Sequence, residues 1–100
     1  MLAEPSPTEF SDLGKLRHFV QSRICDHNQL EIGAYRMTER VLTRGGHPCG
    51  IFFCVHGPRS VKFTAIWETE HNTILFYGSG GERLLRTELR GAPDLASRSG

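Results

Sequence analysis

Hydrophobic residues near the start of the chain recur every three or four positions, which is the period of an amphipathic helix. Thr8 is expected to cap this helix, with Glu9 and Asp12 in its first turn, where the helix dipole favours negative charge. The polar sequence at 26–28 predicts its end. Residues 1–7 offer little to bury, so we expect a flexible arm there. The apolar stripe of the helix consists of Phe10, Leu13, Leu16, Val20 and Ile24.

After the helix, the spacing of the hydrophobic residues changes to a pattern typical of β-strands. Residues 35–44 and 61–68 alternate between apolar and polar side chains, whereas 51–55 and 74–77 are short, continuous apolar runs. Polar or glycine-rich turns separate these segments, so consecutive strands are expected to pair as antiparallel hairpins.

The segment 82–89 fits two structures. Glu82 and Arg86 have the spacing that stabilises a helix, but the apolar residues between 85 and 89 also alternate as in a strand. We favour a strand, because the segment follows another strand through a glycine turn. Residues 91–100 are small, polar or proline-containing and are expected to form a flexible tail.

These elements predict an α+β fold in which an N-terminal amphipathic helix packs on one face of a four- to five-stranded antiparallel meander sheet. A short C-terminal helix in place of the last strand is the alternative. We expect a single domain over residues 8–90, since 100 residues are too few for two domains of ordinary size.

One helix can cover only one face of such a sheet, yet the central strands are apolar on both sides. In the run at 51–55, Phe53 points one way and Phe52 the other. The second face therefore requires a cover: a second copy of the chain, a partner or ligand, or a curl of the sheet itself. The candidate contact residues on this face are Phe52, Cys54, Ile66, Leu75 and Tyr77.

Composition narrows the classes of function. The chain has 12 basic and 11 acidic residues, hence a net charge of +1, which does not favour a dedicated polyanion binder. No apolar run is long enough to span a bilayer, so we expect no membrane partner. The N-terminus lacks the pattern of a secretory signal, and three cysteines cannot all pair, so we expect free thiols in the cytoplasm.

An arginine stripe supports an alternative function. Arg36, Arg40 and Arg44 would share one face of a predicted strand, and guanidinium groups suit phosphate recognition. Together with Arg59 and Lys62, and with aromatic rings on the sheet, they could bind single-stranded nucleic acid. The same arginines could instead pair with carboxylates on a solvated face.

Cysteine and histidine residues near the central strand suggest a second alternative, a small enzyme or metal-binding protein. His47, Cys49, Cys54 and His56 lie within ten residues, but their H-x-C-x4-C-x-H spacing lacks the close pair of ligands typical of structural zinc sites. Cys54 and His56 share a strand face, although no third group or oxyanion site is evident. We therefore expect no catalytic residues, no metal and no cofactor.

The sequence thus favours a small non-catalytic domain that self-associates, as a homodimer, or binds a protein partner through the second apolar face of its sheet. The identity of the partner, the pathway and any chemical role of Cys54 and His56 are not predicted.

Overall fold

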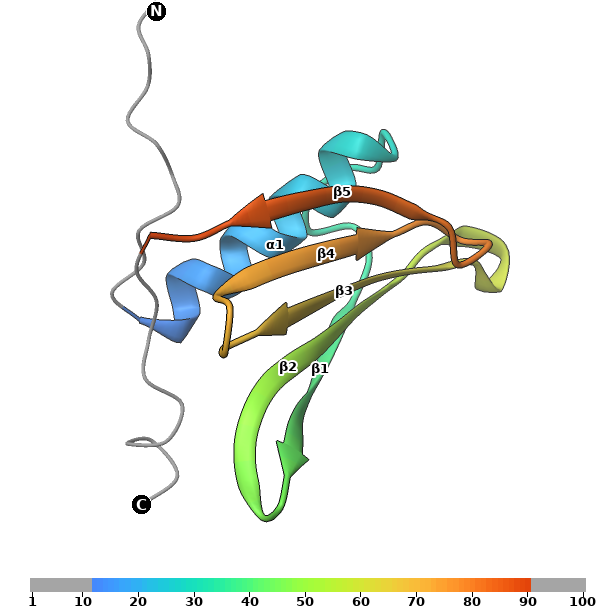
Figure 1. Ribbon diagram of the computed structural model, residues 1–100. Helices are drawn as coiled ribbons and strands as arrows, with labels where there is room; N and C mark the ends of the chain where they lie inside the picture. Colours follow the sequence, from blue (N-terminus) through green and yellow to red (C-terminus); the bar gives the residue numbers. More distant parts are fainter. Residues whose placement is uncertain (1–11, 91–100) are drawn as a thin grey trace, which may run out of the picture.

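The computed structural model describes residues 12–90, which form one helix and a five-stranded antiparallel sheet (Figure 1). The strand order is that of the sequence, so each strand pairs with the next one along the chain. The predicted α+β meander is thereby confirmed, and the segment after residue 82 is a strand and not a helix. The elements are α1 (Leu13–His27), β1 (Met37–Arg44), β2 (His47–His56), the 3-10 turn η1 (Pro58–Ser60), β3 (Lys62–Glu68), β4 (Thr73–Tyr77) and β5 (Arg83–Glu88).

Helix α1 begins later than its apolar stripe suggests. Asp12 is the N-cap: its side chain accepts a hydrogen bond of 2.8 Å from the backbone N–H of Lys15. An N-cap carboxylate satisfies one of the donors left open at a helix start, so Asp12 takes the role expected of Thr8. Thr8, Glu9 and Phe10 lie outside the described residues, as do the predicted arm and tail.

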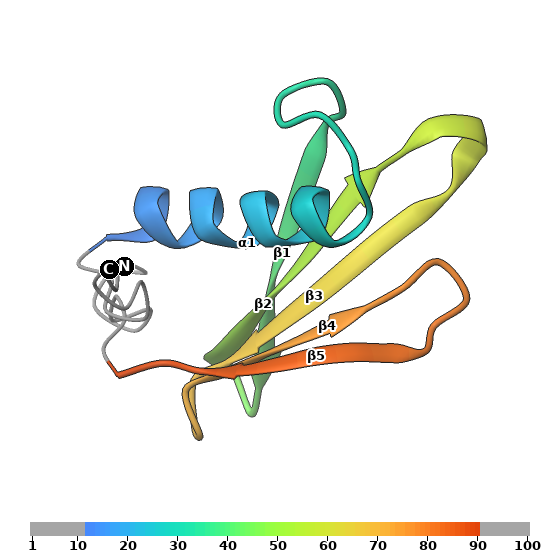
Figure 2. The ribbon, with the colours of Figure 1, turned by 90° about the horizontal axis from the view of Figure 1, so that it is seen from above.

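The apolar side of α1 packs on one face of the sheet, as the view from above shows (Figure 2). Leu16 and Val20 are fully buried against Ile51, Phe53 and other core residues of the central strands. This confirms the stripe from residue 13 to residue 24. The described part of α1 is too short and too polar to cross a membrane, and no other described helix is long enough.

Trp67 belongs to this core, where it is 1% exposed. Its indole N–H donates to the side-chain oxygen of Asn72 at 3.0 Å, and the Asn72 amide donates in turn to the carbonyl oxygen of Leu89 at 3.3 Å. The buried indole is thus satisfied, as a buried N–H must be. Trp67 is therefore a core residue.

An ion pair joins the helix to the edge strand. The guanidinium of Arg17 donates two hydrogen bonds, of 2.6 and 2.9 Å, to the carboxylate of Glu39 on β1. The hydrogen bond to Glu39 raises the pKa of Arg17 and outweighs the opposing effect of desolvation. Glu39 therefore lies on the helix side of β1, as does Val41, which is 46% exposed near the hairpin tip.

Glycines shape the hairpin of β1 and β2 at and near its tip. Gly45 and Gly46 form the two-residue turn between β1 and β2, and both have positive φ, as a type I′ turn requires. Gly50 lies where β2 passes so close to β3 that a Cβ atom would collide with the carbonyl oxygen of Trp67. The register between β1 and β2 shifts just before Gly50, leaving Cys49 unpaired as a bulge.

Candidate functional site

The side of the sheet away from α1 is not covered by another described element, and we call it the open face (Figure 2). It carries the even-numbered positions of β1, β2 and β3, the odd-numbered positions of β4, and Arg83, Arg86 and Glu88 of β5, where the register shifts between Phe76 and Tyr77. This assignment follows from alternation, because Phe53, Trp67 and Phe76 on the other positions are buried against the helix.

The register brings the five predicted contact residues together on the open face. Phe52 lies opposite Ile66, which lies opposite Leu75 on the next strand. Cys54 and Tyr77 flank Thr64 in the adjacent row. Cys54 is 7% exposed and the other four side chains are half-buried, since neighbouring side chains on a pleated face shield one another. A continuous apolar band therefore crosses three strands, β2, β3 and β4.

The two ends of the open face carry charges of opposite sign. Glu68 and Glu88 lie in one row, with Glu68 facing Thr73 and Thr73 facing Glu88 across the strands. We call this row the acidic end. Three rows away, Lys62 lies opposite His56 at what we call the basic end, and Arg83, opposite Tyr77, lies one row closer to the middle. The apolar band lies between the two ends.

The charges at the two ends differ in their partners. Glu68 accepts from the exposed ring of His71 at 3.1 Å, and Glu88 pairs with Arg86 at 2.8 Å. Neither Lys62 nor Arg83 forms an ion pair with any residue from 12 to 90. The basic end thus keeps its charge available, while the acidic end is only partly neutralised.

A shallow groove of about 380 Å³ runs along the open face toward the basic end. Arg40 lies over the Phe52 ring, with its guanidinium carbon 5.9 Å from the ring centroid, within cation–π range. Thr38 and His56 close one side through a 3.0 Å contact between the hydroxyl and the imidazole Nε2. The groove is lined by Thr38, Glu39, Arg40, Phe52, Cys54, His56, Lys62 and Thr64.

The predicted arginine stripe is only partly gathered at this groove. Arg40 and Lys62 line it, and Arg36 lies one row beyond, where its carbonyl oxygen accepts from the backbone of His56. Arg44 instead pairs with Glu70 at 3.6 Å, and Arg59 lies in the turn η1. Two of the five predicted cations therefore line a common groove.

The cysteine and histidine residues considered for metal binding do not assemble. His47 begins β2 at the hairpin tip, Cys49 occupies the bulge, and Cys54 and His56 lie on the open face. Among residues 12–90, no group of three metal-ligating side chains includes any of them. The imidazole of His56 bonds to Thr38, and no described carboxylate hydrogen-bonds to that ring.

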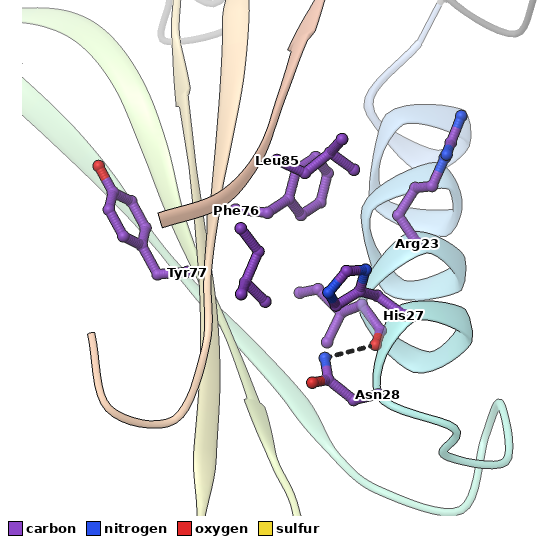
Figure 3. A pocket seen from close by; sticks show the side chains of 8 residues that line it. Arg23, His27, Asn28, Phe76, Tyr77 and Leu85 are labelled. Carbon is purple, nitrogen blue, oxygen red and sulfur yellow. Dashed lines mark hydrogen bonds between the residues drawn. The ribbon is translucent and has the colours of Figure 1, made fainter. Parts of the chain in front are cut away.

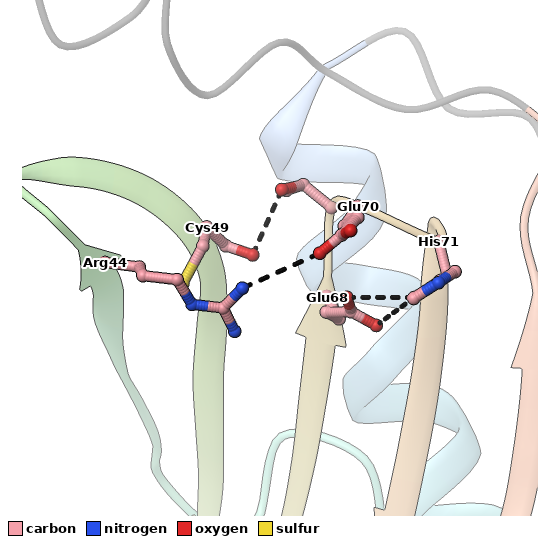
Figure 4. A network of polar contacts seen from close by, with 6 residues as sticks. Arg44, Cys49, Glu68, Glu70 and His71 are labelled. Atoms are coloured by element: carbon pink, nitrogen blue, oxygen red, sulfur yellow. Dashed lines mark hydrogen bonds and ion pairs between the residues drawn. The ribbon is translucent and has the colours of Figure 1, made fainter.

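A polar network that the sequence did not indicate lies at the turn between β3 and β4 (Figure 4). Ligand atoms of Glu68, Glu70 and His71 all lie within 4.8 Å of one another. The Glu70 carboxylate pairs with Arg44, and the Thr69 hydroxyl donates to the carbonyl oxygen of Cys49 at 3.0 Å. The network ties the hairpin of β1 and β2 to this turn, so a structural role accounts for its contacts.

A small cavity lies between the helix and the edge of the sheet (Figure 3). Arg23 and His27 approach it from α1, and Phe76 and Leu85 from the strands. Its volume of about 10 Å³ corresponds to no more than a single water molecule. Tyr77 points away from the helix in the same view, toward the open face. The cavity is therefore a packing gap and not a ligand site.

The charged residues of β5 were missed by sequence reasoning. Arg86 and Glu88 lie on the open face opposite Leu75 and Thr73, and Arg83 lies opposite Tyr77 because the register shifts between Phe76 and Tyr77. Alternation within 82–89 gives the two faces of this strand, but only the register places its charges beside particular residues of β4.

Comparison with known proteins adds no assignment: no protein-family model matches the chain, and no curated protein or solved structure is significantly similar to it.

Proposed function

We propose that this chain is a small, non-catalytic interaction domain that self-associates through its open face. The observation that carries the proposal is the continuous apolar band formed across three strands by Phe52, Cys54, Ile66, Leu75 and Tyr77. Burying such a band removes apolar surface from water, and symmetric dimers are the commonest way to do so. The three free cysteines support a reducing, cytoplasmic location, which is part of the proposal.

Solution mass over a hundredfold range of concentration, with reductant present, tests self-association directly. We expect a reversible dimer of about 22 kDa, twice the chain mass of 11.2 kDa. A strict monomer over the whole range would contradict the proposal. Reductant keeps a disulfide through one of the three thiols from mimicking the dimer.

Phe52→Asp identifies the surface used. We expect this variant to be a folded monomer, because it places a charge in the middle of the apolar band. Val41→Asp is the matched control: Val41 is a strand residue, 46% exposed, on the other side of β1, so the dimer should persist. Circular dichroism establishes folding. A Phe52→Asp chain that unfolds would show that the face is covered within one chain, and would overturn the proposal.

The groove favours a second candidate function, the binding of single-stranded nucleic acid. Its support is the combination of Arg40 stacked on Phe52 with Lys62 nearby, since aromatic rings and cations together bind unpaired bases and phosphates. Fluorescence anisotropy with a labelled oligonucleotide at low salt tests this candidate. Affinity that falls steeply with salt and is lost in Arg40→Ala would support it, and no binding would remove it.

A further inference from the structure

We infer that the partner on the open face is a second copy of the chain turned end for end, so that the basic end of each copy meets the acidic end of the other. This inference rests on the proposed self-association and specifies its geometry. Charge complementarity carries the inference: along the middle strand β3, the open face presents a cation, Lys62, at one end and an anion, Glu68, at the other, with the apolar band between them. Such a surface is complementary to itself only after reversal.

Strand β3 shows this complementarity most directly, because it is the middle strand of the sheet. Its open-face residues are Lys62, Thr64, Ile66 and Glu68, in that order. The lysine and the glutamate are six positions apart, or about 20 Å along a strand. When a second β3 lies over the first and runs in the opposite direction, Lys62 of each copy faces Glu68 of the other.

The apolar residues fit the same reversal. Leu75 and Tyr77 exchange places along β4, and Phe52 and Cys54 exchange places along β2, so the apolar rows of one copy cover those of the other. Sheets that pack face to face keep their strands within roughly 30° of alignment, which preserves this overlap. The reversed pair therefore buries the band and compensates the end charges of β3 together.

The unreversed arrangement is unfavourable on the same grounds. Packing with the strands in the same direction places Lys62 against Lys62 and Glu68 against Glu68, and like charges at an interface oppose association. Lys62 has no ion-pair partner among residues 12–90 that would relieve this repulsion. Glu68, whose side chain is 33% exposed, pairs with the exposed His71 and lies within 4.8 Å of the Glu70 carboxylate, which does not neutralise it.

Charge reversal at the two positions tests the orientation. We expect Lys62→Glu and Glu68→Lys each to raise the dissociation constant of the dimer on the order of tenfold or more, since each disrupts both symmetric contacts. An equimolar mixture of the two variants should form a heterodimer about as tightly as the wild type associates. Sedimentation of the single variants and of the mixture measures all three values. Lys15→Glu and Glu31→Lys, at exposed positions outside the sheet, control for net charge.

The outcomes separate the orientation from the proposed function. A wild-type dimer that Phe52→Asp dissociates, but that neither charge reversal weakens, would overturn the reversed geometry and leave self-association standing. A wild-type monomer would overturn both. Salt provides an independent reading: raising it from about 0.05 M to about 0.5 M should weaken a reversed dimer, whereas screening would strengthen the unreversed one.

Discussion

Two neighbouring phenylalanines summarise the difference between the two faces of the sheet. Phe53 is fully buried beneath α1, whereas Phe52, one residue earlier on the same strand, is half-buried beside Arg40 on the open face. Alternation gives every strand two faces, but residues 12–90 contain one α-helix to cover them. The comparison teaches that apolar character alone does not distinguish a folding core from a binding surface; the cover does.

The two faces also differ in where their charged residues find partners. On the helix side, the ion pair between Arg17 and Glu39 joins two elements of one chain at the rim of the core. On the open face, Lys62 and Glu68 stand at opposite ends of one strand, too far apart to pair with each other. The first arrangement is satisfied within the chain, and the second is the one that the proposed dimer would satisfy.

The largest expected effect comes from truncating the two phenylalanines separately. Phe53→Ala should lower the free energy of unfolding by about 3–5 kcal/mol, because it leaves a cavity in the core. Phe52→Ala should cost less than about 1.5 kcal/mol in the monomer, since its ring is only half-buried. Urea denaturation of dilute protein measures both. Equal losses would contradict the distinction between the faces.

A substitution at Gly50 should affect both faces together. Gly50→Ala forces β2 away from β3, because the added methyl group meets the backbone of Trp67, and we expect a loss of about 1–3 kcal/mol. In an unstrained strand the same change would be neutral or favourable. Urea denaturation again gives the value, and an unchanged midpoint would mean that the strands separate without cost at this point.

Removing the N-cap of α1, the helix that covers the core, should lower the free energy of unfolding by a smaller amount. Asp12→Ala loses the hydrogen bond to the backbone of Lys15, and we expect a cost of about 1 kcal/mol. Asp12→Ser should restore most of the stability, since a serine hydroxyl can also cap a helix. Thermal or urea unfolding of the two variants distinguishes a capping role from a purely electrostatic one, which serine would not rescue.

The smallest effect concerns Cys25, a thiol on the helix side. Burial raises the pKa of Cys25 above its ordinary value of 9.0, so the unfolded chain releases this proton first as pH rises. The free energy of unfolding should therefore fall as pH rises above about 9 through the raised pKa. Comparing wild type with Cys25→Ala at pH 8 and pH 10 isolates this contribution. An equal decline in both proteins would assign it to other groups.

Much of the fold could be predicted from periodicity because the relevant interactions are local. The stripe from Leu13 to Ile24 and the run at 51–55 each identify an element without reference to the rest of the chain. The start of the helix was harder to predict, because several polar residues there can act as the N-cap.

The candidate site was predictable in its apolar part and less so in its charged part. Phe52 and Ile66 follow from alternation, and any antiparallel register keeps them on one face. The pairing of Arg44 with Glu70 and the placement of Arg83 depend on bulges and register shifts. These features arise from contacts between strands, so the pattern of a single strand does not contain them.

The strand order has a consequence for how quickly this chain reaches its native state. Every strand pairs with its neighbour in the sequence, so each hairpin can close without first ordering a distant segment. Such local pairing lowers the average separation of contacting residues, which is the quantity that correlates with folding rate in small domains. Within residues 12–90, the docking of α1 on the sheet, chiefly on β2 and β3, joins parts that are remote in the sequence. We therefore expect folding faster than that of sandwiches with crossed connections, and a slow final step would point to docking of the helix.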